Sequence, residues 1–286
     1  MREPVRARAG LAALTLLSGV AVLVTMVPAE AMTSSVDRAT ALFVVRDRAI
    51  DESSGLARRQ RLFVTTNDSG DTGRLFVLNR RGRTVGVTHW SDRSLDTEAL
   101  APAGRRSVWV GDIGDNRQSR TSISINRVSV GRGQRDVRPR TYRLAYPGGA
   151  ADAETLIRNP ATGRLYVATK SPGGGILYAV PRRPSRARVN VLRRVGPVLA
   201  TATDGTFLPG GRFLVVRSYS RAALYRWPSL TPLGSFSLPG QQQGEGIAAG
   251  RHGVLFLCSE GVRQPVLRML LPTGLRRAVE AATPGV

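Results

Sequence analysis

Five acidic residues recur along the chain in the same local setting, and together they could bind a divalent cation. Each stands among small residues and precedes apolar ones, in DESSGLA, DTEALAP, DAETLIR, TDGTFLP and GEGIAAG. They recur at intervals of about 50 residues, at Glu52, Glu98, Glu154, Asp204 and Glu245. Carboxylate oxygens are hard ligands that suit Ca²⁺ or Mg²⁺. If the fold gathers these side chains, the sequence predicts a divalent cation site.

A second group of polar residues follows the next apolar run of each repeat. The segments TTNDSGD and GDIGDN combine oxygen donors with glycines, as loops that hold cations or ligands do. Three flanking carboxylates, Asp51, Asp96 and Asp152, add negative charge. We predict ligand-binding residues in this second group at Asn67, Asp68, Asp71, Asp112, Asp115, Asn116, Lys170, Arg217 and Glu260.

The five recurring acidic residues have a second interpretation that involves no ligand. A carboxylate at the start of a strand can accept backbone N–H bonds from a neighbouring unit, and it would recur because the units recur. Clustered carboxylates repel one another unless a cation compensates, although Lys170 and Arg217 could pair with some of them. Both the cation interpretation and this backbone-anchor interpretation are open from the sequence.

Apolar runs follow each acidic residue in a fixed order and predict four short strands per repeat. About ten residues after the acidic position comes a run such as LFVTT or FLVVR, then a third such as RLFVLN and a fourth such as TVGVTHW. Turn residues separate the runs, and no helical periodicity persists through residues 32–286. The sequence therefore predicts an all-β fold, a five-bladed β-propeller, with six blades as the alternative.

The last repeat lacks an outer strand, whereas one extra apolar run precedes the first repeat. This run, ALFVVRD at residues 41–47, can complete the last blade and close the ring. Residues 32–286 are expected to form a single propeller domain that ends in a surface tail or short helix at residues 273–286.

Blade geometry places the two polar groups at the same end of the ring. The inner strand runs away from the face at which the chain enters the blade, and the second strand returns to that face. The start of the inner strand and the loop after the second strand therefore share one rim. We expect the acidic residues and the predicted ligand-binding residues to meet at this mouth of the central channel.

The first 31 residues have the features of a secretory signal peptide. Three arginines precede an apolar run at residues 11–26, and the AEA sequence ending at Ala31 matches an A-x-A cleavage site. The apolar run is shorter than the roughly 20 residues of a membrane-spanning helix, although an uncleaved anchor is the alternative. We expect cleavage after Ala31, a secreted or extracytoplasmic protein, and no transmembrane span in the rest of the chain.

Composition excludes several classes of protein. The single cysteine, Cys258, cannot form an intramolecular disulfide, and two histidines cannot build a multi-histidine zinc site. The formal net charge is +22, but the arginines are scattered and no nucleic-acid-binding motif is present, so nucleic acid is not an expected partner. The arginine surplus favours adhesion to an anionic polymer of the cell envelope or to lipid head groups. We expect a monomer.

The repeats resemble those of a known group of secreted propellers. ESSGLA, LFVTTNDSGDTGRLFVLN, DTEALA and GEGIA are similar to segments of the SdiA-regulated family and of the esterase-like, phytase-type propellers, and more distantly of gluconolactonase-type propellers. The resemblance implies a divalent cation, often calcium, bound by the acidic residues at the starts of the inner strands. Gluconolactonase-type sites mix Glu, Asn and Asp, whereas this ring is almost wholly acidic.

Three functions are open at this stage. The first is a secreted propeller that binds a cation, and with it a small ligand or an envelope component, at the channel mouth. The second is a metal-dependent hydrolase of an ester, lactone or phosphoester, in which a carboxylate acts as general base. The third is a structural interaction module. A propeller fold supports all three, so the fold does not choose among them.

Overall fold

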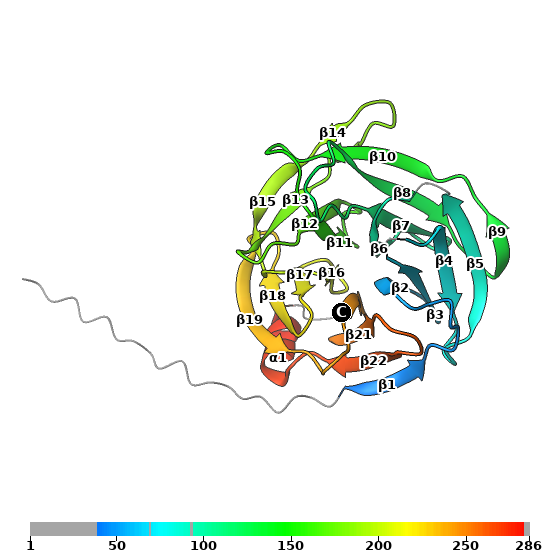
Figure 1. Ribbon diagram of the computed structural model, residues 1–286. Helices are drawn as coiled ribbons and strands as arrows, with labels where there is room; N and C mark the ends of the chain where they lie inside the picture. Colours follow the sequence, from blue (N-terminus) through cyan, green and yellow to red (C-terminus); the bar gives the residue numbers. More distant parts are fainter. Residues whose placement is uncertain (1–38, 69, 92–93, 283–286) are drawn as a thin grey trace, which may run out of the picture. The chain divides into compact units, whose positions relative to one another are not determined.

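A computed structural model describes residues 39–68, 70–91 and 94–282. Within these residues, 22 strands form five sheets and a helix follows the last strand. The sheets are arranged around a common axis as the five blades of a β-propeller (Figure 1). The predicted all-β, five-bladed fold is confirmed. Residues 1–31, predicted to be a signal peptide, lie outside the described residues.

We number the blades in the order in which their inner strands occur along the chain. From the inner to the outer strand, blade 1 contains β2 (Ser53–Arg59), β3 (Leu62–Asn67), β4 (Gly73–Leu78), β5 (Thr84–Ser91) and β9 (Gly133–Asp136). Blade 2 contains β6 (Thr97–Pro102), β7 (Ser107–Asp112), β8 (Ile123–Ser129), β10 (Arg140–Ala145) and β14 (Asn190–Val191).

The other three blades have four strands each. Blade 3 contains β11 (Ala153–Arg158), β12 (Leu165–Thr169), β13 (Gly175–Ala179) and β15 (Arg193–Val198). Blade 4 contains β16 (Asp204–Phe207), β17 (Phe213–Arg217), β18 (Arg221–Arg226) and β19 (Thr231–Ser237). Blade 5 contains β20 (Gly244–Ala249), β21 (Val254–Ser259), β22 (Pro265–Leu270) and, as its outer strand, β1 (Thr40–Val44).

The ring closes through β1, as the sequence predicted. This strand pairs antiparallel with β22, so blade 5 combines the start of the described chain with its last three strands. Figure 1 shows β1 lying along the outside of β22. Two strands were not predicted: β9 and β14 pair parallel with β5 and β10 and add a fifth strand to blades 1 and 2. They are short and largely polar, so they carry no apolar strand pattern.

Five hydrophobic clusters hold the ring together, one between each pair of neighbouring blades. Successive residues of a second strand point into different clusters. Val215 packs between blades 4 and 5, whereas Val216 packs between blades 3 and 4. Because side chains alternate along a strand and both faces of a blade are covered, the middle of each second strand carries apolar residues on both faces.

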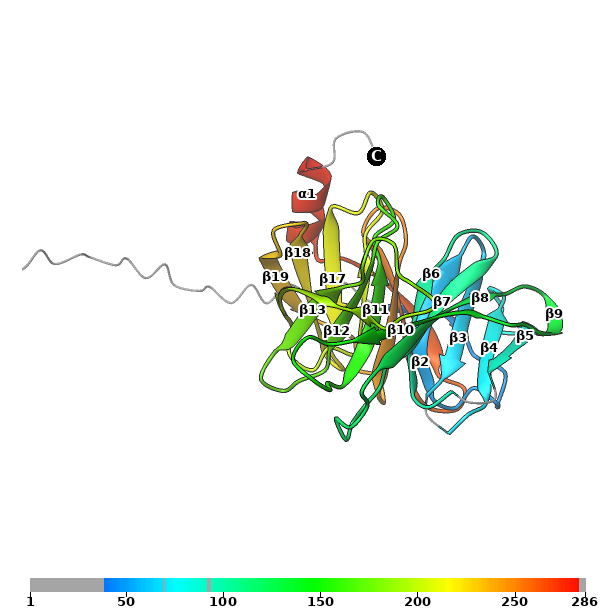
Figure 2. The same ribbon diagram turned by 90° about the horizontal axis from the view of Figure 1, so that it is seen from above.

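The helix α1 (Thr273–Ala281) confirms the predicted short helix at the end of the domain. Leu275 and Val279 pack against the cluster between blades 4 and 5, and both views place the helix beside β18 and β19 (Figure 2). Among the described residues, no helix has the length and apolar character needed to cross a bilayer.

Candidate functional site

The five recurring acidic residues lie at the starts of the inner strands, as the repeat predicted. Glu52 directly precedes β2, Asp204 is the first residue of β16, and the other three are the second residues of β6, β11 and β20. Each inner strand contacts the next around the ring. The five positions therefore surround one end of the channel.

The small residues after the acidic positions allow the inner strands to approach one another. A Cβ atom on Gly55 would lie 2.6 Å from the backbone nitrogen of Leu100 in blade 2. A Cβ atom on Gly246 would lie 2.8 Å from the backbone nitrogen of Leu56 and 2.6 Å from Cys258 Sγ. In blades 1, 4 and 5 the motif thus joins an acidic residue to a glycine, at Gly55, Gly205 or Gly246, where a side chain would be too close to its neighbours.

Three carboxylates form the centre of the site. One oxygen from each of Asp68, Asp96 and Glu98 lies within 4.8 Å of the others. Glu98 is 3% exposed, and its Oε2 accepts a hydrogen bond of 3.0 Å from Ser54 Oγ. A Cβ atom on Gly114 would lie 2.3 Å from Asp96 Oδ2 and 2.8 Å from Glu98 Oε1. The second glycine of GDIGDN therefore makes room for these carboxylates.

Four glutamates surround this centre: Glu52, Glu154 and Glu260 interact electrostatically with its carboxylates, and Glu245 interacts with Glu154 and Glu260. We call the whole group the acidic mouth, and it consists of Glu52, Asp68, Asp96, Glu98, Glu154, Glu245 and Glu260. Glu52 is exposed and Glu260 is half-buried, whereas the two glutamates of β11 and β20 are buried. The mouth therefore has a buried part and an open rim.

Burial and mutual repulsion disfavour the charged forms of these carboxyl groups. Burial and, after it, repulsion from nearby carboxylates, Asp68 first, together raise the pKa of Glu98 to about 10. Burial also raises the pKa of Glu245 to about 9 and that of Glu154 to about 7, although Lys170 opposes the shift at Glu154. Ionising the buried part of the mouth is therefore costly unless positive charge enters it.

Two buried carboxylate oxygens of the acidic mouth have no hydrogen-bond partner among the described residues. They are Glu154 Oε2 and Glu245 Oε2, in residues that are 5% and 3% exposed. Lys170 Nζ pairs with the other oxygen of Glu154, and Gln243 Nε2 donates to Glu245 Oε1 at 3.3 Å. A buried acceptor without a donor is costly. These two oxygens have the chemistry of ligands for a hard cation.

Lys170 lies in this end of the channel, as predicted, and neutralises part of its charge. Its Nζ forms an ion pair with Glu154 and lies 5.3 Å from the ring centroid of Tyr219. Burial lowers the pKa of Lys170, but hydrogen bonds to Glu154 and Tyr219 outweigh that effect and raise the pKa above its ordinary value. Arg120 opposes the pKa rise of Asp96, and Arg217 opposes that of Glu245, so these three cations offset only part of the effect of burial and repulsion.

Asp204 differs from the other four recurring acidic residues. It is 0% exposed, and burial raises its pKa well above the ordinary value. Its Oδ1 accepts the N–H of Gly205, and its Oδ2 accepts the N–H of Ile247 in blade 5, both at 2.7 Å. These contacts match the backbone-anchor interpretation, and we leave Asp204 out of the proposed ligand set.

Arg217 is enclosed in the same way. It is 0% exposed and donates to the carbonyl oxygens of Gly246 and Cys258 in blade 5 and of Ser218 and Tyr219 in blade 4. A further hydrogen bond of 3.1 Å reaches Gln241 Oε1. Its guanidinium group links two blades and is not presented to the mouth.

The remaining predicted ligand-binding residues differ in whether their polar atoms already have partners. Asp71 and Asp112 form ion pairs with arginines at 2.6 and 3.0 Å, and Asp115 accepts two backbone N–H bonds of 2.9 Å from the loop that follows it. Asn116 is exposed. Asn67 is buried with its Oδ1 unpartnered, so it offers one more oxygen acceptor within the described residues.

Sequence reasoning missed several residues of the site. Asp96 was noted only as a flanking charge, yet it belongs to the three-carboxylate centre, and its position two residues before Glu98 was the available signal. Ser54, Gly114 and Tyr219 reach the site through tertiary contacts. No local pattern marks them.

The chain was also compared with known protein families, curated sequences and solved structures. No family model and no curated protein sequence matches the chain. Two solved structures described as glucose dehydrogenase are similar to it, with 10% and 11% identity and TM-scores of 0.49 and 0.48 over 82% of this chain and 99% of theirs. A nidogen/laminin complex is also similar, with 15% identity and a TM-score of 0.45 over 73% of each chain. The resemblance to the SdiA-regulated and phytase-type propellers stays a prediction.

The raised carboxyl pKa values predict how metal-free stability depends on pH. A carboxyl group with a higher pKa in the folded state stabilises the protein fully below its unfolded pKa, and this contribution is lost as pH rises through the folded pKa. For Glu154 and Glu245 the window runs from the ordinary 4.5 to about 7 and about 9. We therefore expect the melting temperature in chelator to fall across this window.

Thermal unfolding in buffers of matched ionic strength measures this effect. Glu245→Gln should flatten the upper part of the curve, because the amide has no proton to lose, whereas Glu280→Gln on the exposed face of α1 should leave the curve unchanged. A metal-free melting temperature that stays constant or rises between about pH 5 and pH 9 would contradict the expectation.

Proposed function

We propose that the acidic mouth binds a divalent cation, with calcium as the expected ion, and that the bound cation holds a small ligand or a component of the cell envelope. Asp68, Asp96 and Glu98 would be the inner ligands, and the free oxygens of Glu154 and Glu245 would extend the donor set. The observation that carries the proposal is the presence of these two unpartnered, buried carboxylate oxygens, together with a three-carboxylate cluster that interacts electrostatically with Glu154.

The chemistry of the donor set suits calcium. All five side chains offer oxygen, and calcium accepts about six to eight oxygen ligands in flexible geometry. A bound cation would supply the positive charge that the buried carboxylates lack and would attract an anionic or hydroxyl-bearing group of a ligand. In this proposal Ser54 fixes Glu98, Lys170 holds Glu154, and the exposed Glu52 and Asn116 lie where a ligand would approach.

The same proposal includes an extracytoplasmic location. The arginine-led apolar run and the A-x-A site of the first 31 residues support export, and a surface rich in arginine suits adhesion to an anionic envelope polymer. The expected monomer stays a prediction.

Calcium should raise the melting temperature of the protein, and a chelator should reverse the change. An ion that binds only the folded state at about 100 times its Kd adds about 2.7 kcal/mol of stability, or roughly 5–10 °C for a domain of this size. Differential scanning calorimetry with calcium, magnesium and chelator measures the response. The double variant Asp96→Asn/Glu98→Gln should lose it.

A matched control removes two carboxylates elsewhere. Asp136→Asn/Glu280→Gln changes exposed residues of β9 and α1 and should keep the full calcium response. The metal-free Asp96→Asn/Glu98→Gln protein should be at least as stable as the wild type at neutral pH, because it lacks the partly buried charge of Asp96, whose pKa is raised to about 6. If that variant is strongly destabilised and calcium affects neither protein, the acidic residues are scaffolding and the cation proposal is wrong.

A further inference from the structure

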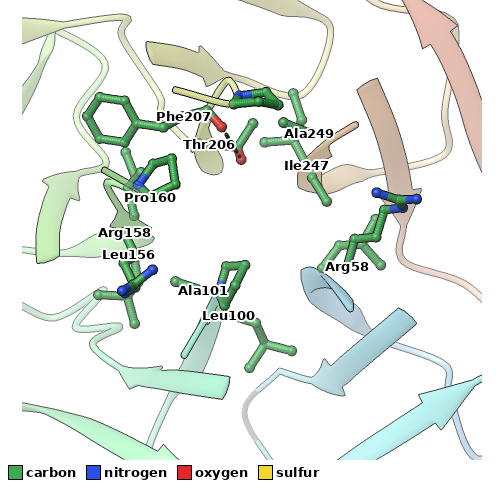
Figure 3. Close-up of a pocket in the computed structure, with 16 residues that line it drawn as sticks. Arg58, Leu100, Ala101, Leu156, Arg158, Pro160, Thr206, Phe207, Ile247 and Ala249 are labelled. Carbon is green, nitrogen blue, oxygen red and sulfur yellow. Dashed lines mark hydrogen bonds between the residues drawn. The ribbon is translucent and has the colours of Figure 1, made fainter. Parts of the chain in front are cut away.

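The end of the channel opposite the acidic mouth contains a separate cavity of about 240 Å³. It is lined by the later residues of the inner strands, whereas the acidic mouth uses their first residues. Leu56, Leu100, Leu156 and Ile247 each come from a different inner strand, and Phe207 adds an aromatic ring from β16 (Figure 3). The lining is mainly apolar, and the proposed cation site does not use it.

Two arginines lie on opposite sides of this cavity (Figure 3). Arg58 is near the end of β2, and Arg158 is the last residue of β11. Within the part of the chain that the structure describes, neither guanidinium group forms an ion pair or a hydrogen bond. Arg58 lies over the ring of Phe256, with Cζ 5.3 Å from the centroid. Burial lowers the pKa of both arginines, so each charge carries a desolvation cost that no nearby carboxylate offsets.

The surroundings of the two arginines are also positive. Among the described residues, no Asp or Glu lines this cavity or the two cavities beside it. One neighbouring cavity shares Arg58, and the two contribute further arginines at Arg61, Arg80, Arg105, Arg106 and Arg127. Because the channel's carboxylates gather at the other end, this end combines an apolar cavity with unpaired positive charge.

We propose that this arginine-flanked cavity binds a small anionic amphiphile, a molecule with an alkyl chain or ring and a carboxylate or phosphate head. The apolar part would occupy the cavity, and the anionic head would lie at its rim, where Arg58 and Arg158 can form charge-assisted hydrogen bonds. An apolar cavity of about 150 Å³ accommodates benzene. A cavity of about 240 Å³ therefore has room for a somewhat larger group, such as a medium-length alkyl chain.

Isothermal titration calorimetry with octanoate tests the proposal on the intact domain, and inorganic phosphate and 1-octanol serve as head-only and tail-only probes. Octanoate should bind at one site with at least about ten-fold higher affinity than either probe. Calcium and chelator should not change this affinity, which separates the result from that of the cation proposal. Arg58→Gln/Arg158→Gln should weaken octanoate binding about ten-fold or more.

Two further variants distinguish the cavity from general surface charge. Ala249→Phe should block binding, because Ala249 lines the cavity, whereas Arg140→Gln, at an exposed position of β10 in blade 2, should leave binding unchanged. Each protein is first checked for a wild-type circular dichroism spectrum. The proposal is overturned if octanoate does not bind the wild type, or if its affinity survives both cavity variants. It is equally overturned if vesicles of anionic phospholipid bind while octanoate does not, since the face would then be a surface for polyanions.

Discussion

Deletion of residues 41–47 should lower the free energy of unfolding by about 5 kcal/mol or prevent folding altogether, because this segment closes the ring. Phe43 and Val45 are buried, and each such side chain contributes about 1.5–3 kcal/mol. The segment also supplies the strand pairing of β1 with β22 and a backbone hydrogen bond of 2.9 Å from Arg46 to Gly82 of blade 1. Its loss would leave β22 as an exposed edge.

Equilibrium unfolding in urea, with light scattering to detect association, measures the effect. Truncation after Pro272 is the control, since it removes α1, a helix with no fully buried residue, and should cost only about 1–2 kcal/mol. If both deletions lower stability equally, β1 is an accessory strand and the ring is held by the clusters between blades alone.

The sequence contained most of the information about the fold. The acidic-small motif marks each inner strand, and in β2, β16 and β20 it also includes a glycine at a position where a neighbouring strand leaves no room for a side chain. The second strands are apolar on both faces, so they stand out from the turns. The polar strand β9 has neither feature. It forms because its backbone pairs in parallel with the edge of β5, and that pairing depends on tertiary geometry alone.

The site was harder to predict than the fold. Residues at equivalent positions of a repeat have equivalent backbone places, but their neighbours differ from blade to blade. Glu98 meets Asp68 and Asp96, and Glu154 meets Lys170. Asp204 stands in the same place and instead accepts backbone N–H bonds from two residues. The charge and spacing of the acidic residues do not show which of them face other carboxylates and which anchor the backbone. That difference depends on which groups of the adjacent blade contact each residue.

The same difficulty applies to Arg217, and its substitution should have one of the largest effects on stability. Arg217→Met should lower the free energy of unfolding by about 4 kcal/mol, because buried carbonyl oxygens lose charge-assisted donors and cannot be reached by water. Four carbonyl oxygens and one side-chain oxygen accept hydrogen bonds from this guanidinium. Two of the carbonyls belong to blade 5, so the loss would weaken the junction between blades 4 and 5.

Arg74→Met is the matched comparison, because it removes an arginine from a partly exposed ion pair with Asp71. Such pairs contribute less than about 1 kcal/mol, so chemical denaturation should distinguish the two variants clearly. At temperatures where Arg217→Met is still folded, it should keep the calcium response of the wild type, because the guanidinium belongs to the scaffold and not to the proposed ligand set. The opposite pattern would be wild-type stability with a lost calcium or ligand response. It would show that Arg217 is a binding residue of the acidic mouth and that its buried hydrogen bonds contribute little to stability.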